Sequence, residues 1–202
     1  MRVLALLIVA SASVSAQPVA EVVVYEDSRW LRYEYENDEL FLGCSLACGI
    51  AWTLSTSSAL APLGRNRYGA AQAEDNSART AWVEGAAGDG VGERLTFQLE
   101  GSPEAAPDYV IDFHSIDLVN GYAKSEALWR ANGRVREALV RVNGTPVARA
   151  VLADTMLPQS VRFPEAVGVR LGDVISFEIA SVYPGSRYAD TAISEIVLHG
   201  GH

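Results

Sequence analysis

The stretch ALVRVNGTPVARAVL at residues 138–152 decides the fold class of this chain. Two short apolar stretches, 138–142 and 147–152, stand on either side of Asn143-Gly144. Both residues of an Asn-Gly pair tolerate a positive φ, which the commonest two-residue hairpin turns require. The stretch therefore predicts an antiparallel β-hairpin.

Stretches of the same kind recur along the chain from residue 51, separated by turn residues such as Asn132-Gly133 and Pro184-Gly185. The expected strands are Ala51–Ser55, Leu95–Leu99, Tyr109–Val119, Ala138–Val142, Val147–Leu152, Val161–Phe163, Val174–Val182 and Ile193–Leu198. Only Ser125–Ala131 has the character of a short helix, and strands do not alternate with helices. This organisation predicts an all-β antiparallel sandwich of the jelly-roll type.

Composition and charge limit the classes of function. The chain has 202 residues, of which 49% are hydrophobic and 20% charged, as in an ordinary globular domain. Its formal net charge is −9, Lys124 is the only lysine, and no stretch is strongly basic. Because phosphate neutralisation dominates nucleic-acid affinity, the sequence argues against nucleic acid as a partner, and likewise against anionic membranes.

The N-terminus has the features of an export signal. Arg2 precedes an apolar run, Val3–Ala10, and Val14-Ser15-Ala16 is a small-residue cleavage site before Gln17. The run is too short to cross a bilayer core of about 30 Å, which disfavours a membrane anchor. We expect a signal peptide at 1–16, an N-terminal extension at 17–43 and one domain at 44–202, in a secreted or periplasmic protein.

Two cysteines, Cys44 and Cys48, lie four residues apart. In an oxidising compartment they most simply form a small-loop disulfide. The alternative is a metal site, which needs about four ligands, and nothing near the pair supplies the other two.

The densest group of polar residues runs from Asp75 to Glu93. Asp75 and Thr80 have the short oxygen-bearing side chains that bind calcium, or that complete an Asx turn. Trp82 is suited either to stacking on a sugar ring or to a place in the core. Glu84 and Glu93 are a candidate pair of glycosidase carboxylates, or two structural glutamates.

Two further groups follow. Tyr122, Lys124 and Asn132 fall in one loop region and suit carbohydrate hydroxyls, or a structural loop. A polar and aromatic run occupies 182–196, and Glu195 lies there inside an apolar strand, where a charge needs a partner or a metal.

No nucleophile–base pair can be named from the sequence. The histidines are His114, His199 and His202, and neither a G-x-S-x-G nor an H-E-x-x-H motif occurs. We therefore do not expect an enzyme.

Six motifs in order carry a family resemblance: Thr80–Gly85, Gly88–Glu93, Asn120–Ser125, Asn132 with Arg134, Val182–Gly185, and Asp190–Ile196. They resemble the domain that accompanies the catalytic domain in secreted bacterial NAD glycohydrolase, a translocation or glycan-binding domain similar to discoidin-type (coagulation factor C-domain) modules. The resemblance covers about residues 44–198 and implies a galactose-binding-like sandwich that binds rather than hydrolyses.

The resemblance also implies site residues. It maps a structural calcium ion to Asp75, Thr80 and Glu195. Candidate ligand contacts within the matched motifs are Trp82, Glu84, Tyr122, Lys124, Asn132, Arg187 and Tyr188. The chain departs from many relatives at Ser45–Ala47, where they have aromatic residues, so a contact made there by relatives is in doubt.

We expect a carbohydrate partner, and the alternative is a structural or protein–protein interaction module on the same scaffold. An exposed aromatic side chain among Trp82, Tyr122 and Tyr188, beside polar groups, indicates a glycan. A fully buried set indicates a protein partner.

Overall fold

A computed structural model of the chain describes residues 18–25, 50–101 and 110–201. The expected signal peptide, the Cys44–Cys48 disulfide and most of the N-terminal extension lie outside the described residues. Within them, no helix is long and apolar enough to cross a membrane.

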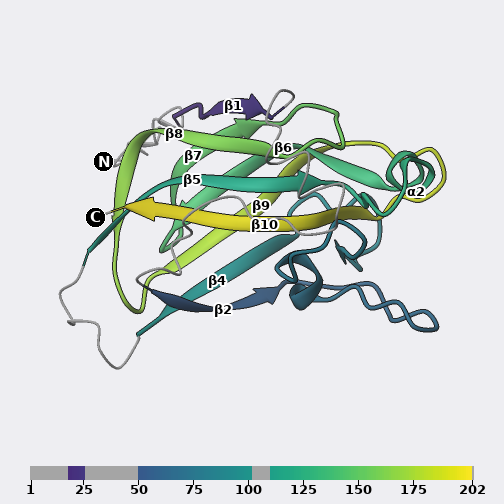
Figure 1. Ribbon diagram of the computed structural model, residues 1–202, viewed down its shortest axis with the longest axis horizontal. Coiled ribbons are helices and arrows are strands. Elements are labelled where there is room, and N and C mark those ends of the chain that lie inside the picture. The colour runs from purple at the N-terminus through teal and green to yellow at the C-terminus, as the bar shows by residue number, and fades with distance from the viewer. Residues whose placement is uncertain (1–17, 26–49, 102–109, 202) are drawn as a thin grey trace, which may run out of the picture.

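The described chain is a sandwich of two mainly antiparallel sheets, which the pairing of β10 with β6 joins into one hydrogen-bonded path of ten strands (Figure 1). One sheet has the order β1-β8-β5-β10, with β3 on the end of β10, and the other has the order β7-β6-β9-β4-β2. The strands are β1 Glu21–Val24, β2 Ala51–Thr56, β3 Trp82–Val83, β4 Arg94–Glu100, β5 Ile111–Asn120, β6 Gly133–Val142, β7 Thr145–Val151, β8 Gln159–Val169, β9 Val174–Tyr183 and β10 Thr191–Gly201. The expected all-β sandwich is confirmed.

The central hairpin forms where the sequence predicts it. β6 and β7 pair antiparallel up to Val142 and Thr145, and Asn143 and Gly144 make the turn between them with φ of 51° and 78°. Two successive positive φ angles define a turn whose twist matches that of the strands, and glycine takes such an angle without a steric penalty.

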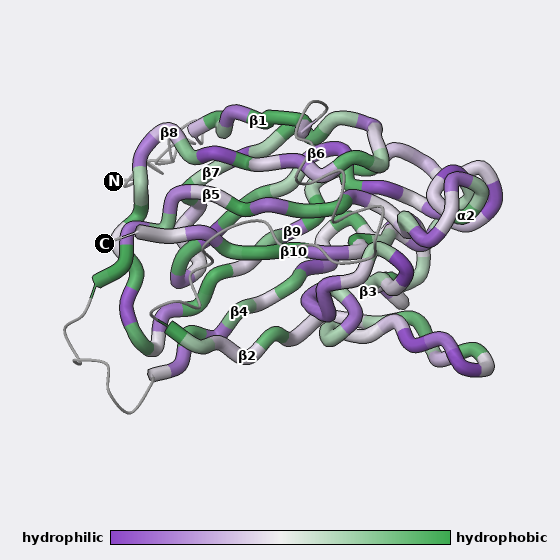
Figure 2. Tube along the Cα trace, in the orientation of Figure 1, coloured by the Kyte–Doolittle hydropathy of each residue, from purple (hydrophilic) through white to green (hydrophobic). Residues whose placement is uncertain are grey.

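The core lies between the two sheets. Apolar side chains alternate with polar ones along β4, where Leu95, Phe97 and Leu99 are buried, and Figure 2 shows the same alternation of colour along several strands. Phe113 and Phe163 meet edge-on, with ring centroids 4.7 Å apart. A continuous buried cluster of this kind supplies most of the favourable free energy of folding.

The two sheets are joined at two places. At one end, β10 pairs in parallel with β6 through Thr191 and Ala192. At the far edge, the backbones of Pro18 and Ala20 hydrogen-bond to Arg149 of β7, and the chain then continues as β1 beside β8. The described part of the N-terminal extension is therefore a strand of the sandwich that closes the edge between β7 and β8.

The described segments also contain two short helical elements. The expected helix at 125–131 is present as α2, Glu126–Ala131, whose first turn is capped by the hydroxyl of Ser125 accepting from the Leu128 N–H. A 3-10 turn, η2, spans Ala70–Ala73. Helix α2 and the loop at 57–69, which projects from the end of β2, lie at the same end of the sandwich (Figure 1).

Candidate functional site

A cavity of about 320 Å³ opens at the end of the sandwich that carries α2. Its walls come from the 57–69 loop, β3, the segment after β5, α2 and the segment before β10. The lining residues are Leu60, Leu63, Asn66, Tyr68, Val83, Tyr122, Lys124, Leu128, Asn132, Tyr188 and Asp190. Segments far apart in the sequence thus meet at one concave surface, as in typical small-ligand sites.

Two tyrosines form the apolar part of the cavity. Tyr68 and Tyr122 meet edge-on with ring centroids 6.4 Å apart, and both are more than nine-tenths buried. They pack with Val83 and Leu128 in a small cluster separate from the main core. Burial, with Tyr68 as a second cause, raises the pKa of the Tyr122 hydroxyl, so this group stays neutral as a hydrogen-bond donor.

Polar side chains occupy the rest of the cavity. Lys124 and Tyr188 are exposed, whereas Asn132 is nearly buried and its Nδ2 donates to the Leu128 carbonyl at 2.8 Å, across the end of α2. Asp190 is half-buried, just before β10. The cavity therefore offers cationic, anionic, amide and hydroxyl groups around an apolar floor.

The structure brings together four of the expected ligand contacts, Tyr122, Lys124, Asn132 and Tyr188, in the lining of this cavity. Arg187 lies beside it: its guanidinium stacks on the Tyr188 ring at 5.1 Å, but it is not among the lining residues. Trp82 and Glu84 do not reach the cavity surface.

The prediction that Trp82 contacts the ligand is contradicted by its burial. Its side chain is fully buried in the main core, and its indole Nε1 donates to the Ser58 carbonyl at 2.8 Å. Strand β3 holds it there by pairing with Ile193 of β10. A sugar cannot stack on this ring without unfolding the site, so the tryptophan supports the fold instead.

Burial also contradicts the prediction that Glu84 contacts the ligand. Its fully buried carboxylate accepts from the backbone N–H groups of Ala86 and Thr191. Burial raises its pKa, with those two hydrogen bonds opposing the shift. Gly90, at φ +76°, packs so closely over it that a Cβ there would lie 2.5 Å from the Glu84 Cγ.

Glu93, the other carboxylate of the suggested glycosidase pair, accepts from the hydroxyls of Ser57 and Ser58, which lower its pKa. Glu84 has no exposed surface from which to reach a substrate. The pair therefore fastens loops together rather than facing each other across a cleft.

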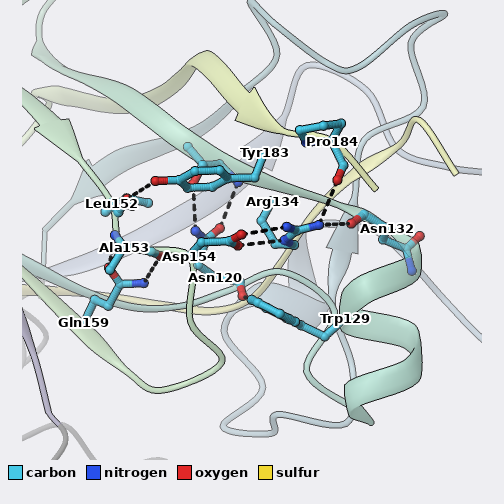
Figure 3. A network of polar contacts seen from close by, with 11 residues as sticks. Asn120, Trp129, Asn132, Arg134, Leu152, Ala153, Asp154, Gln159, Tyr183 and Pro184 are labelled. Carbon is cyan, nitrogen blue, oxygen red and sulfur yellow. Dashed lines mark hydrogen bonds and ion pairs between the residues drawn. The ribbon is translucent and has the colours of Figure 1, made fainter. Parts of the chain in front are cut away.

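Behind the cavity, a buried polar network fixes α2 and the 184–190 segment to the sheet (Figure 3). Arg134 makes a bidentate pair with Asp154 at 3.0 and 2.9 Å, and donates to the carbonyls of Asn132 and Pro184. Its guanidinium lies 4.7 Å from the centroid of the Trp129 ring. One side chain thus ties together two segments that line the cavity.

The residues mapped to calcium lie close together next to β10. The Thr80 hydroxyl is 2.8 Å from both carboxylate oxygens of Asp75. Glu195 is 2% exposed and accepts from the N–H groups of Asn76 and Ser77. Burial, with Asp75 as a second cause, raises the pKa of Glu195 to about 9.

This cluster fits a hard cation. Two carboxylates and a hydroxyl provide the oxygen donors that calcium prefers, and a nearby cation would remove the electrostatic cost of burying Glu195. No group of three or more His, Cys, Asp or Glu side chains able to hold a metal is found among residues 18–25, 50–101 and 110–201. Further ligands would be side-chain amide, hydroxyl or backbone carbonyl oxygens, or water.

Several cavity residues were not predicted from the sequence. Leu60, Leu63, Asn66 and Tyr68 come from the 57–69 loop, whose irregular backbone has no periodic pattern. The turn-rich run Gly-Arg-Asn-Arg-Tyr-Gly at 64–69, with an aromatic residue between polar ones, was the available signal. Asp190 lay inside a matched motif but was not singled out.

Comparison with solved structures finds the same fold in carbohydrate-binding domains. The chain is similar to the CBM32-1 and CBM32-2 domains of Clostridium perfringens ZmpB in complex with GalNAc, with a TM-score of 0.60 and 12% identity over 95% of this chain and 42% of that one. It is also similar to a putative chitobiase fragment from Bacteroides thetaiotaomicron, with a TM-score of 0.52 and 15% identity over 75% of this chain and 90% of that one.

The chain spans less than half the length of the Clostridium chains in that complex and in the same domains without GalNAc. No curated protein sequence matches it. A family model does, over residues 47–199, from a position between the β1 and β2 strands to the end of β10. Since the match takes in every described strand except β1, and every wall of the cavity, the chain belongs to the NAD glycohydrolase translocation F5/8 type C domain family.

Proposed function

We propose that the protein is an exported, non-catalytic module that binds carbohydrate in the cavity between the 57–69 loop, α2 and the segment before β10. The observation that carries the proposal is the cavity itself, where two tyrosine rings and four kinds of polar group surround about 320 Å³. Sugars have apolar C–H faces and a rim of hydroxyls, and such a surface complements both.

The exposure of the aromatic residues favours a glycan over a protein partner. Tyr188 is 40% exposed and shares the cavity with Lys124, Asn132 and Asp190. Tyr122 lines the same space, and only Trp82 of the three aromatic candidates is withdrawn into the core. The fold that the chain shares with carbohydrate-binding domains supports the same choice.

The test is a glycan array on the protein, with Tyr188→Ala as the site variant. Loss of the ring should weaken binding about tenfold, because an aromatic contact on a ligand contributes about 0.5–1.5 kcal/mol beyond its buried area. Val151→Ala, an exposed residue of β7 outside the cavity, is the matched control and should bind as the wild type does. If protein shown to be folded bound no glycan on a broad array, the result would instead favour a structural or protein–protein interaction module.

We also propose that Asp75, Thr80 and Glu195 hold a structural calcium ion. When bound, the ion would neutralise the two carboxylates and fix the 75–82 loop against β10. The wild type should melt at a higher temperature in calcium than in chelator, and Glu195→Gln should lose most of that difference. Equal melting temperatures in both buffers would remove calcium from the proposal while leaving glycan binding open to its own test.

A further inference from the structure

Lys124 lines the cavity as an exposed cation. Within the parts of the chain that the structure describes, no carboxylate lies within ion-pair distance of its ammonium group, although four arginines there have such partners. It is also the only lysine in the sequence. An unpaired ammonium group in a concave site is a ready partner for an anion.

Three arginines are sequence neighbours of residues that line the cavity. Arg65 and Arg67 are exposed on the 57–69 loop, on either side of Asn66, and Arg187 is exposed next to Tyr188. Because low-dielectric walls focus the field of charges at the mouth of a cleft, the cavity should attract anions.

The cavity is not suited to a simple anion alone. Asp190 lines it as well, and a carboxylate side chain is a good acceptor for sugar hydroxyls, which a bare phosphate or sulfate does not supply. Tyr68, Tyr122 and Leu128 provide an apolar surface that a bare anion does not use. A ligand that complements the Lys124 cation, the Asp190 acceptor and the apolar surface would carry a carboxylate, hydroxyls and an apolar ring face in one molecule.

Size points to a single sugar residue. The cavity volume of about 320 Å³ lies at the lower end of the range of about 300–1,000 Å³ that ligand sites occupy. The site therefore suits the terminal residue of a glycan rather than a long segment of chain.

We propose that the cavity selects an acidic sugar, a uronic or sialic acid at the end of a glycan, with Lys124 as the counter-ion of its carboxylate and Asp190 as an acceptor of its hydroxyls. This inference rests on the proposed carbohydrate-binding function and names its ligand class. Asn132, whose Nδ2 donates to the Leu128 carbonyl, lines the same cavity.

The test compares pairs of sugars in which one member has a carboxylate and the other has a neutral group in its place. The probes are galacturonate against galactose, glucuronate against glucose, and N-acetylneuraminate against its methyl ester, each titrated into the protein by calorimetry. At least one acidic sugar should bind about tenfold or more tightly than its neutral counterpart, because hydrogen bonds to charged groups are stronger than those between neutral ones. The uronates and N-acetylneuraminate distinguish the two sources of the carboxylate.

Substitutions assign the effect to Lys124. Lys124→Met should abolish the preference for the acidic sugar, while Lys124→Arg should keep much of it. Arg170→Met, in the turn between β8 and β9, removes the same charge away from the cavity and should leave the preference unchanged. Melting curves of all three variants verify that they are folded.

The outcomes separate this inference from the proposed function. If neutral sugars bind as tightly as acidic ones and Lys124→Met has no effect, the acidic ligand is overturned and carbohydrate binding stands. If folded protein binds none of the six probes and no glycan of the array, both proposals fail.

Discussion

Arg134 illustrates how one residue can support a site without touching a ligand. Its guanidinium makes two hydrogen bonds to Asp154 and two to main-chain carbonyls, and stacks on Trp129 (Figure 3). The side chain is only 9% exposed. Planar, fixed donors suit this task, which lysine could not perform with a single ammonium group.

We predict that Arg134→Met lowers the free energy of unfolding by about 2 kcal/mol, because the carbonyls of Asn132 and Pro184 lose a charged donor, whereas Asp154, whose side chain is 39% exposed, can be hydrated instead. Urea denaturation measures this directly. Arg130→Met is the matched control: Arg130 pairs with Glu126 one turn away on the surface of α2, and its loss should cost no more than about 0.5 kcal/mol. Equal effects of the two substitutions would contradict the role given to Arg134.

A second residue-scale prediction concerns pH. The hydroxyls of Ser57 and Ser58 hold the pKa of Glu93 below its ordinary value of 4.5. A lowered pKa stabilises the folded state above the unfolded value, and this contribution is lost as the pH falls through the folded value. Glu93→Gln should therefore be less stable than the wild type at pH 7, and the difference should shrink as denaturation is repeated toward pH 3. A gap that stays constant with pH would contradict this reading.

Trp82 and Glu84 show the limit of prediction at the residue scale. Both lie in a motif that the family resemblance picks out, and the resemblance alone cannot tell a residue that touches the ligand from one that holds the loop in place. Burial decides between these roles, and burial depends on strands and loops from elsewhere in the chain. Tyr122 and Lys124 were identified because polar and aromatic residues gather in the turn after β5.

At the scale of elements, α2 has only six residues, but it supplies Leu128 to the cavity and is followed by Asn132 as its C-cap. A helix of this length is only marginally stable in isolation, so α2 depends on its N-cap and on its packing against the sandwich for stability. Ser125→Ala removes the side-chain acceptor at the first turn and should cost about 1 kcal/mol of stability.

Ser125→Asp keeps an acceptor at that position and should restore most of the loss. Glycan affinity measured on the same proteins should fall with Ser125→Ala, because Leu128 and Asn132 move with the helix. If Ser125→Ala weakened neither stability nor binding, the helix would not be what shapes this wall of the cavity.

Strands were easier to predict than the walls of the site. The hairpin of β6 and β7 follows from two apolar stretches around Asn143-Gly144, and its turn has the expected geometry. β8 is longer than expected, 159–169 rather than 161–163, because Pro164, Glu165 and other exposed residues interrupt its pattern. β3 has two residues and exists only because β10 pairs with it, so no local pattern could reveal it.

At the scale of the whole molecule, the sandwich depends on a segment outside the matched family region. Residues 18–24 join β7 to β8, while the family match begins at residue 47. Unpaired strand edges are templates for association with other chains. We predict that deleting residues 18–24 lowers the urea midpoint and makes the protein self-associate, as measured by light scattering.

The control for this deletion is Val19→Ser, which changes a residue that is 60% exposed and keeps the backbone pairing. It should associate no more than the wild type and be as stable. A monomeric deletion variant of undiminished stability would show that the edge between β7 and β8 needs no cover.

The same pairing has a consequence for the order of folding. Val22 of β1 is aligned with Val161 of β8. β1 is synthesised well before β8, so it cannot form its native pairing until β8 is present. Contacts so distant in sequence form slowly, whereas the β6–β7 hairpin closes locally. Until it pairs, β1 can instead add to the open edge of a second copy of the protein. Refolding at high protein concentration should therefore produce a dimer in which two copies exchange this segment.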